Sequence, residues 1–195
     1  MTLRIVIPVK PFAEAKQRLA PALNAEARAQ LAESMFRHVF DVATRFAGSR
    51  AAIVVSRAPD ILRHAAESGA AGLLETGNPN LNSALVQAAD FARGLGASLL
   101  LIIASDLPFL GESDLEAMTK RPCAIAPDRR GQGTNALLWP LSPFAGFHFG
   151  EGSFARHRSA AGEVGLDPQT VSRPGLMHDI DLPCDLLPRG QDDPQ

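Results

Sequence analysis

The sequence predicts an α/β fold with a mainly parallel, doubly wound sheet, and three observations support this class. Short apolar runs alternate with longer segments of helical periodicity through the first two-thirds of the 195 residues. The run Leu99–Ile103 is apolar at every position, as expected for a strand covered on both faces. The composition, 46% hydrophobic and 21% charged, is sufficient for one well-buried domain. Right-handed crossovers between parallel strands then give the doubly wound arrangement.

The expected strands and helices alternate in order along this part of the chain. A strand over Leu3–Val9 precedes a helix over 24–46, in which Leu31, Met35 and Val39 recur at helical spacing. The later elements are a strand over 51–55, a helix over about 59–68, a short strand at 73–74, a helix from Asn82 or Ser83 to about 95, the strand Leu99–Ile103 and a helix beginning near Glu112.

The last third has a different pattern. Shorter strands are expected over 123–126, 136–138 and 147–148, separated by turns rich in glycine and proline. A helix over about 153–162 follows, and Val171 is expected to begin or end another strand. We find no repeat or linker, so we expect one domain over 1–187 and a polar, frayed tail over 188–195.

Composition excludes several classes of protein. A net charge of −2 leaves no basic field that would bind nucleic acid. The two cysteines, Cys123 and Cys184, indicate neither a disulfide framework nor a zinc site. No apolar segment reaches the ~20 residues that span a membrane, and no leader precedes the first strand, so we expect a cytoplasmic protein. The oligomeric state is left open, with a homodimer as one expectation.

Asp106 is the most informative residue, because it follows the buried strand Leu99–Ile103. Open α/β sheets bind ligands at the carboxyl ends of their strands, where a carboxylate can hold a divalent cation against phosphates. The alternative is a turn residue or a helix cap.

The loop after the first strand carries three cations, Lys10, Lys16 and Arg18, over nine positions. If the loop crosses the carboxyl edge of the sheet, these side chains converge on an anion such as a nucleoside triphosphate. The alternative is an exposed loop that the charges keep soluble.

Three further segments carry polar groups that suit ligand binding. Asn82 and Ser83 can pair with a base or ribose, or can simply cap a helix. Thr134 and Asn135 follow a Gly-x-Gly turn, which is also typical of a hairpin. Near the next predicted helix, Gly150 and the capping residue Ser153 offer backbone amides and a hydroxyl to a phosphate or carboxylate. Arg156 and His157 follow one helical turn beyond Ser153 and can reach the same ligand. A single histidine such as His148 is more often a packed residue than a catalytic one.

Asp179 and Asp181 are the last pair. If the segment is extended, both carboxylates project to one face, which favours a bound cation; an acidic surface turn is the alternative.

Taken together, these segments resemble the guanylyltransferases of coenzyme F420 biosynthesis, a family that acts on 2-phospho-L-lactate or phosphoenolpyruvate. The matching pieces, in order, are IPVK at 7–10, AKQRL at 15–19, LNSAL at 81–85, SDLP at 105–108, APDR at 126–129 with GTN at 133–135, FGEGSF at 149–154 with His157, and DID at 179–181. Leu182 departs from the threonine that family members often carry there.

The resemblance implies a nucleotidyltransferase fold of the glycosyltransferase-A kind, with three layers, and the use of GTP and Mg²⁺. It implies a metal held by Asp106, Asp179 and Asp181, and an acid that contacts Thr134, Gly150 and Ser153. We expect Asn135 and His157 to bind the acid as well. We also expect GTP contacts at Pro8, Lys10, Lys16, Asn82, Ser83 and Asp106, and catalysis by Lys10, Lys16, Arg18 and Asp106.

The expected reaction moves GMP from GTP onto the phosphate of a three-carbon acid, which is phosphoenolpyruvate, 2-phospho-L-lactate or 3-phospho-D-glycerate. Such transfers depend on positioning and charge neutralisation, so no nucleophilic side chain is required. Two alternatives stay open: a sugar-phosphate nucleotidyltransferase or other transferase of the same fold, and a GTP-binding module without turnover.

Overall fold

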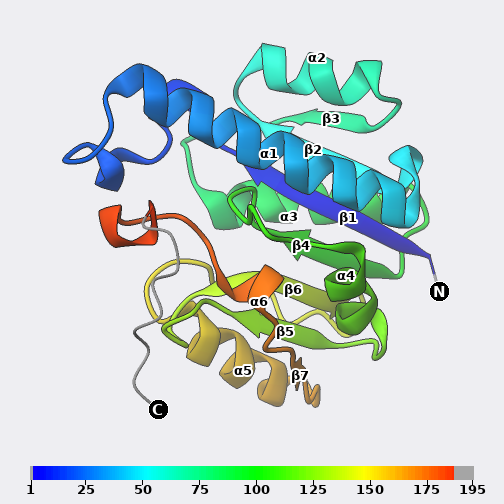
Figure 1. Cartoon of the computed structure of the whole chain (residues 1–195). Helices are drawn as coiled ribbons and strands as arrows, with labels where there is room; N and C mark the ends of the chain where they lie inside the picture. Colours follow the sequence, from blue (N-terminus) through cyan, green and yellow to red (C-terminus); the bar gives the residue numbers. More distant parts are fainter. Residues whose placement is uncertain (1, 187–195) are drawn as a thin grey trace.

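The structure is a computed structural model that describes residues 2–186. Within these residues, all seven strands belong to one sheet (Figure 1). The strands lie in the order β3-β2-β1-β4-β6-β5-β7. Their bounds are β1 Leu3–Val9, β2 Ala52–Ser56, β3 Ala71–Leu74, β4 Leu99–Ile103, β5 Ala124–Pro127, β6 Thr134–Pro140 and β7 Gln169–Thr170.

Helices connect these strands. The α-helices are α1 Ala25–Ala47, α2 Pro59–Glu67, α3 Leu81–Gly94, α4 Glu112–Thr119, α5 Ser153–Glu163 and α6 Pro174–Met177. Short 3-10 helices are η1 Phe12–Glu14, η2 Gln17–Leu19, η3 Ser49–Ala51 and η4 Pro183–Leu186.

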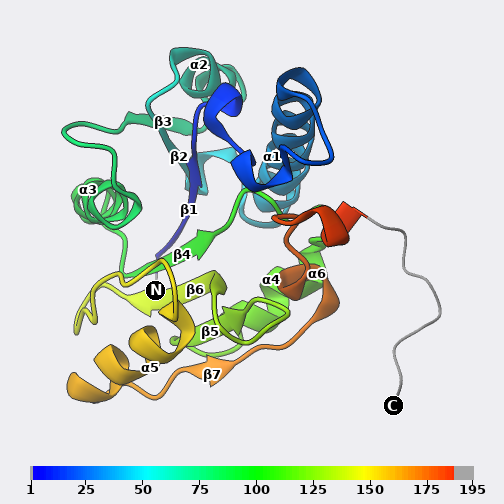
Figure 2. The ribbon, with the colours of Figure 1, turned by 90° about the vertical axis from the view of Figure 1, so that its left-hand side faces the viewer.

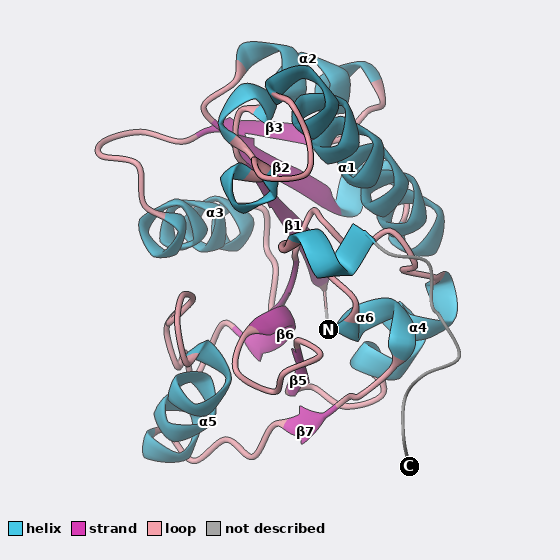
Figure 3. Ribbon diagram, turned by 60° about the vertical axis from the view of Figure 1, so that its left-hand side comes forward, coloured by secondary structure: helices cyan, strands magenta, loops and turns pink. Residues whose placement is uncertain are grey.

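The helices form two layers, one on each face of the sheet (Figures 2 and 3). Buried side chains of α1, α2, α4 and α6 pack on one face, and those of α3 and α5 pack on the other. Alternation along a strand supplies both layers, since Ile5 and Ile7 belong to the first core and Val6 between them to the second. The predicted three-layer α/β fold is therefore confirmed.

Strand β6 is the exception in the mainly parallel sheet. β3, β2, β1 and β4 run parallel, whereas β6 runs antiparallel to both of its neighbours, β4 and β5. The first residues of β6 therefore lie beside the carboxyl end of β4, where Ala104 N donates to Asn135 O at 2.8 Å. This reversal brings Thr134 and Asn135 to the edge that carries Asp106. The Gly-x-Gly turn before them is the hairpin between β5 and β6.

Three local predictions need correction. The segment 147–148 is not a strand, because its neighbouring N–H groups bond to side chains instead: His148 N donates to His157 Nε2 and Phe149 N to Asn82 Oδ1. Ser153 does not cap α5, since it is already the first helical residue. Neither Asn82 nor Ser83 caps α3; Asn80 does, accepting from Ser83 N at 3.1 Å.

Other predictions concern cysteines, membranes and the tail. Cys123 and Cys184 are both free, which agrees with the absence of a disulfide framework. Within residues 2–186, no helix is long and apolar enough to cross a membrane. The predicted frayed tail over 188–195 lies outside the described residues.

The cap of α1 gives a test of local stability. Asn24 Oδ1 accepts from Ala27 N at 2.8 Å, which satisfies one of the free amides at the helix start. We expect Asn24→Ala to lower the free energy of unfolding by about 1 kcal/mol and Asn24→Asp, which keeps the acceptor, to change it by only a few tenths. Urea unfolding measures both; equal losses would contradict the capping role.

Candidate active site

A cluster of opposite charges lies at the carboxyl edge of the sheet. Lys16 Nζ forms an ion pair with Asp106 Oδ2 and lies 3.6 Å from Asp181 Oδ1. Arg18 Nη1 holds the other oxygen of Asp181 at 2.9 Å. Four of the predicted residues, from three segments distant in the sequence, therefore meet at one place.

The backbone of Lys16 is shaped to reach this place. Lys16 is the only described residue other than glycine with a positive φ (54°, with ψ 35°), and it separates η1 from η2. The left-handed conformation costs an L-residue on the order of 1 kcal/mol, and such strain is found mostly at functional sites. Only 8% of its side chain is exposed, so its charge is neutralised mainly by the two aspartates.

Asp179 extends the cluster. Its Oδ1 accepts from Asn135 Nδ2 at 3.2 Å, and the same amide donates to Leu176 O at 3.0 Å. Burial raises the pKa of Asp179, and the nearby negative charge of Asp106 raises it further, against the lowering effect of the Asn135 hydrogen bond. Asn135 therefore positions a carboxylate of the site.

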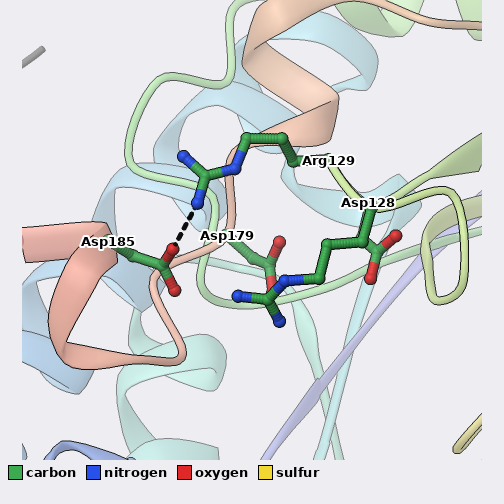
Figure 4. Close-up of a pocket in the computed structure, with 5 residues that line it drawn as sticks. Asp128, Arg129, Asp179 and Asp185 are labelled. Atoms are coloured by element: carbon green, nitrogen blue, oxygen red, sulfur yellow. Dashed lines mark hydrogen bonds and ion pairs between the residues drawn. The ribbon is translucent and has the colours of Figure 1, made fainter. Parts of the chain in front are cut away.

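Beside Asp179 lies a hollow that sequence reasoning did not assign. Asp128, Arg129, Arg130, Asp179 and Asp185 line it (Figure 4). Arg129 Nη2 pairs with Asp185 Oδ1 at 2.7 Å, which ties the β5–β6 turn to the segment after Asp181. The pair Arg129 and Arg130 beside a glycine-rich turn could have indicated this site from the sequence, whereas no feature of the sequence near Asp185 indicates its role.

Asp185 holds the backbone of Asp181 and Leu182 through two hydrogen bonds. Its Oδ2 accepts from Leu182 N at 2.7 Å and from Asp181 N at 3.0 Å. Burial alone would raise the pKa of Asp185, but these two N–H groups and the charges of Arg129 and Arg130 together lower it. Asp185 is therefore held as a carboxylate that shapes the turn carrying Asp181.

A second group lies on the other side of β6. Thr134 Oγ1 lies 3.1 Å from His157 Nδ1 and 3.2 Å from Ser153 Oγ. His157 Nε2 accepts from His148 N at 2.9 Å. Burial, together with the smaller effect of the nearby charges of His148 and Arg156, lowers the pKa of His157 to about 3, so the ring is neutral at pH 7. His157 has no exposed surface and supports Thr134, and its predicted contact with the substrate stays a prediction.

The loop before α5 offers fewer free amides than the sequence suggested. Ser153 N donates to Gly150 O and Phe154 N to Gln132 O, both at 3.1 Å. Gly150 has a φ of 117°, which L side chains rarely adopt. The amides of Ser153 and Phe154 are therefore already bonded to backbone carbonyls.

The remaining predicted residues lie apart from both groups or are already paired. Asn82 contacts the backbone of Phe149 with both ends of its amide, at 2.8 and 3.2 Å. Ser83 Oγ lies 3.5 Å from Asn80 Oδ1. Pro8 is within β1, and Lys10, just beyond that strand, is exposed. Their nucleotide contacts stay predictions.

Three aspartates of the cluster, Asp106, Asp179 and Asp181, are the predicted metal ligands. Among residues 2–186, no three His, Cys, Asp or Glu side chains are arranged to hold one ion together. Asp106 and Asp179 nevertheless interact closely enough that one raises the pKa of the other, so this pair suits a cation. Asp181 is turned to Lys16 and Arg18 instead.

Solved structures share this architecture. A chain described as a nucleotide-diphospho-sugar transferase from Desulfovibrio desulfuricans G20 matches with a TM-score of 0.77 and 16% identity, covering 95% of this chain and 84% of that one. CMP:2-keto-3-deoxy-manno-octonic acid synthetase, solved with CTP, matches with a TM-score of 0.59 and 13% identity, over 95% of both chains. The fold is that of the nucleotidyltransferases, and this protein is an enzyme of that class.

Sequence relatives narrow the class. The family model described as guanylyl transferase CofC like matches residues 3–188, and the chain belongs to this family. Phosphoenolpyruvate guanylyltransferases from Rubrobacter xylanophilus and Sphaerobacter thermophilus are 40% and 38% identical, over 95% of this chain and 92% and 91% of theirs. A 2-phospho-L-lactate guanylyltransferase from Methanobrevibacter smithii is 31% identical, over 93% and 80%. The predicted family is therefore confirmed.

The neutral state of His157 predicts how stability depends on pH. A lowered pKa in the folded state means that the unfolded chain binds the proton first, so stability is full above pH 6.5 and falls as the pH drops toward 3. We expect His157 to account for a loss of about 2 kcal/mol between pH 7.5 and 5. Urea unfolding of the wild type and of His157→Gln at pH 7.5 and at pH 5 measures this loss, because only the wild type has the His157 imidazole that takes up a proton on unfolding. Equal pH slopes would contradict it.

Proposed function

We propose that the protein transfers GMP from GTP to the phosphate of a phosphorylated three-carbon acid and releases pyrophosphate. The observation that carries the proposal is the meeting of Lys16 and Arg18 with Asp106, Asp179 and Asp181 at the carboxyl edge of the sheet. The names of the relatives, which include phosphoenolpyruvate and 2-phospho-L-lactate guanylyltransferases, support the acceptor class. GTP supply favours a cytoplasmic location; a homodimer stays a prediction.

The transfer needs no nucleophilic side chain. A phosphate oxygen of the acid attacks the α-phosphorus of GTP, and the bond from that phosphorus to the β-phosphate oxygen breaks as pyrophosphate leaves. The attacking phosphate is already an anion at neutral pH, so no general base is required. Catalysis then consists of alignment and charge neutralisation, and we assign the neutralisation of the phosphates to Lys16, Arg18 and Lys10.

The remaining residues divide between metal and acid. Asp106 and Asp179 would hold Mg²⁺, with Asp181 as the third ligand once it leaves Lys16; the ion, when bound, neutralises phosphate charge. Thr134, Ser153 and Gly150 would contact the acid. Asn135 and His157 would act behind them, by positioning Asp179 and Thr134.

The first test is the reaction itself. Purified protein is incubated with GTP, Mg²⁺ and one of phosphoenolpyruvate, 2-phospho-L-lactate or 3-phospho-D-glycerate. We expect pyrophosphate release and a guanylylated acid by mass spectrometry with at least one acid. Binding of GTP without pyrophosphate release would instead indicate a non-catalytic module, and product from a sugar phosphate alone would indicate the other transferase alternative.

The role of Asp106 gives a second test. We expect Asp106→Asn to lower kcat by about 100-fold or more, because it removes a charge that acts on the phosphates through the metal. Asp90→Asn is the matched control, since Asp90 is exposed on α3 and, among residues 2–186, pairs only with its helix neighbour Arg93. Full activity and unchanged Mg²⁺ dependence in Asp106→Asn would refute the metal assignment.

A further inference from the structure

A buried chain of hydrogen bonds runs from the backbone of His148 through His157 to the hydroxyls of Thr134 and Ser153. The three distances are 2.9 Å for His148 N to His157 Nε2, 3.1 Å for His157 Nδ1 to Thr134 Oγ1, and 3.2 Å for Thr134 Oγ1 to Ser153 Oγ. The exposed fractions of the residues are 0% for His157, 1% for Ser153 and 7% for Thr134. The proposed function uses His157 only as a residue behind Thr134, and these bonds define that role further.

This series of hydrogen bonds fixes the position of one proton of His157. A backbone N–H can only donate, so His157 Nε2, which receives the His148 N–H, must be the nitrogen without a proton. A neutral imidazole then carries its proton on Nδ1, where it points at Thr134 Oγ1. His157 is therefore a donor to Thr134.

Two aromatic rings hold the plane of the His157 ring. The Phe149 ring stands edge to face against His157 at 4.7 Å between centroids, and the Trp139 ring does so at 6.2 Å. A ring flip would replace both nitrogens by carbons at the two hydrogen-bonding positions. Packing therefore holds the plane of the ring, and the two hydrogen bonds decide which of the two flipped orientations it adopts.

The donors and acceptors of the Thr134 and Ser153 hydroxyl groups can be assigned in the same way. The Thr134 oxygen accepts from His157 and from Ser153, which leaves the Thr134 hydroxyl proton without an acceptor among the residues that the structure describes. If the Thr134–Ser153 bond ran the other way, the Ser153 proton would be left instead. In either case the pair has one proton to donate outward, and Thr134 keeps the larger exposed fraction.

We propose that His157 is a positioning residue for the acceptor: its Nδ1 proton occupies Thr134 Oγ1 and turns the Thr134 hydroxyl into a hydrogen-bond donor aimed at the phosphorylated acid. This inference rests on the proposed function, which places the acid at Thr134. Ionised phosphate and carboxylate oxygens accept hydrogen bonds, and a bond to a charged acceptor is stronger than one to a neutral acceptor, so a site fixed as a donor favours an anion.

A double-mutant cycle tests the inference. His157→Gln and Thr134→Val are made singly and together, and the KM values for phosphoenolpyruvate and for GTP are measured. We expect each single variant to raise KM for the acid about tenfold with KM for GTP unchanged, as for one lost hydrogen bond to a charged group. We expect the double variant to match Thr134→Val, because His157 acts only through that hydroxyl.

A matched control is His38→Gln, since His38 lies in α1 and bonds to Leu110 O, away from β6. It should change neither KM. If the effects of His157→Gln and Thr134→Val multiply in the double variant, or if His157→Gln leaves KM for the acid unchanged, the inference is overturned and His157 is merely structural.

A second measurement needs no variant. In wild-type protein with ¹⁵N-labelled histidine, NMR reports which ring nitrogen carries the proton; we expect His157 neutral with the proton on Nδ1 at pH 7, with and without phosphoenolpyruvate. A proton on Nε2 would overturn the inference. A wild type that guanylylates none of the acids would refute the proposed function, whereas an active wild type with an insensitive His157→Gln would refute only this inference.

Discussion

The ammonium group of Lys16 joins the segments on which the proposed active site depends. It contacts Asp106, 90 positions away in the chain, and lies beside Asp181 near the far end of the described residues. A charge with so little exposure must be paired, so this contact requires the loop after β1, the end of β4 and the acidic segment to meet. The left-handed backbone at Lys16 indicates that the fold accepts local strain to keep the contact.

The reversed direction of β6 divides the site into two halves. Consecutive residues of a strand point to opposite faces, so Thr134 faces α5 and His157 while Asn135 faces α6 and Asp179. One half gathers carboxylates and cations, and the other gathers neutral hydroxyls and an uncharged histidine. On the proposed function, the first half handles the triphosphate and the second handles the acid.

The charges of the first half are balanced within the protein. Lys16 and Arg18 pair with Asp106 and Asp181, and Arg129 pairs with Asp185. On the proposed function, a triphosphate would compete with these carboxylates for the same cations, and the carboxylates so released would be free to hold Mg²⁺. The Arg129–Asp185 pair also joins the β5–β6 turn to the segment of Asp181, so the two are held together before any substrate arrives.

The sequence by itself determined the fold class, the family and most of the charged site. Apolar runs and helical periodicity are local properties, so β1, α1 and β4 were predicted closely. Asp106 and Lys16 were predicted as a site because parallel strands end at one edge, a rule that holds before any contact is known. By contrast, the direction of β6, the failure of 147–148 to form a strand and the Asn80 cap depend on partners distant in the chain or on single hydrogen bonds.

Only the tertiary structure decided the roles of His157, Asn135 and Asp185. Nothing near His157 in the sequence shows that its Nε2 is hydrogen-bonded to His148 N and its Nδ1 to Thr134 Oγ1. Nothing near Asp185 shows that it holds the turn of Asp181 from one side and Arg129 from the other. A residue type limits which bonds a side chain can make, but burial and long-range neighbours decide which of them it does make.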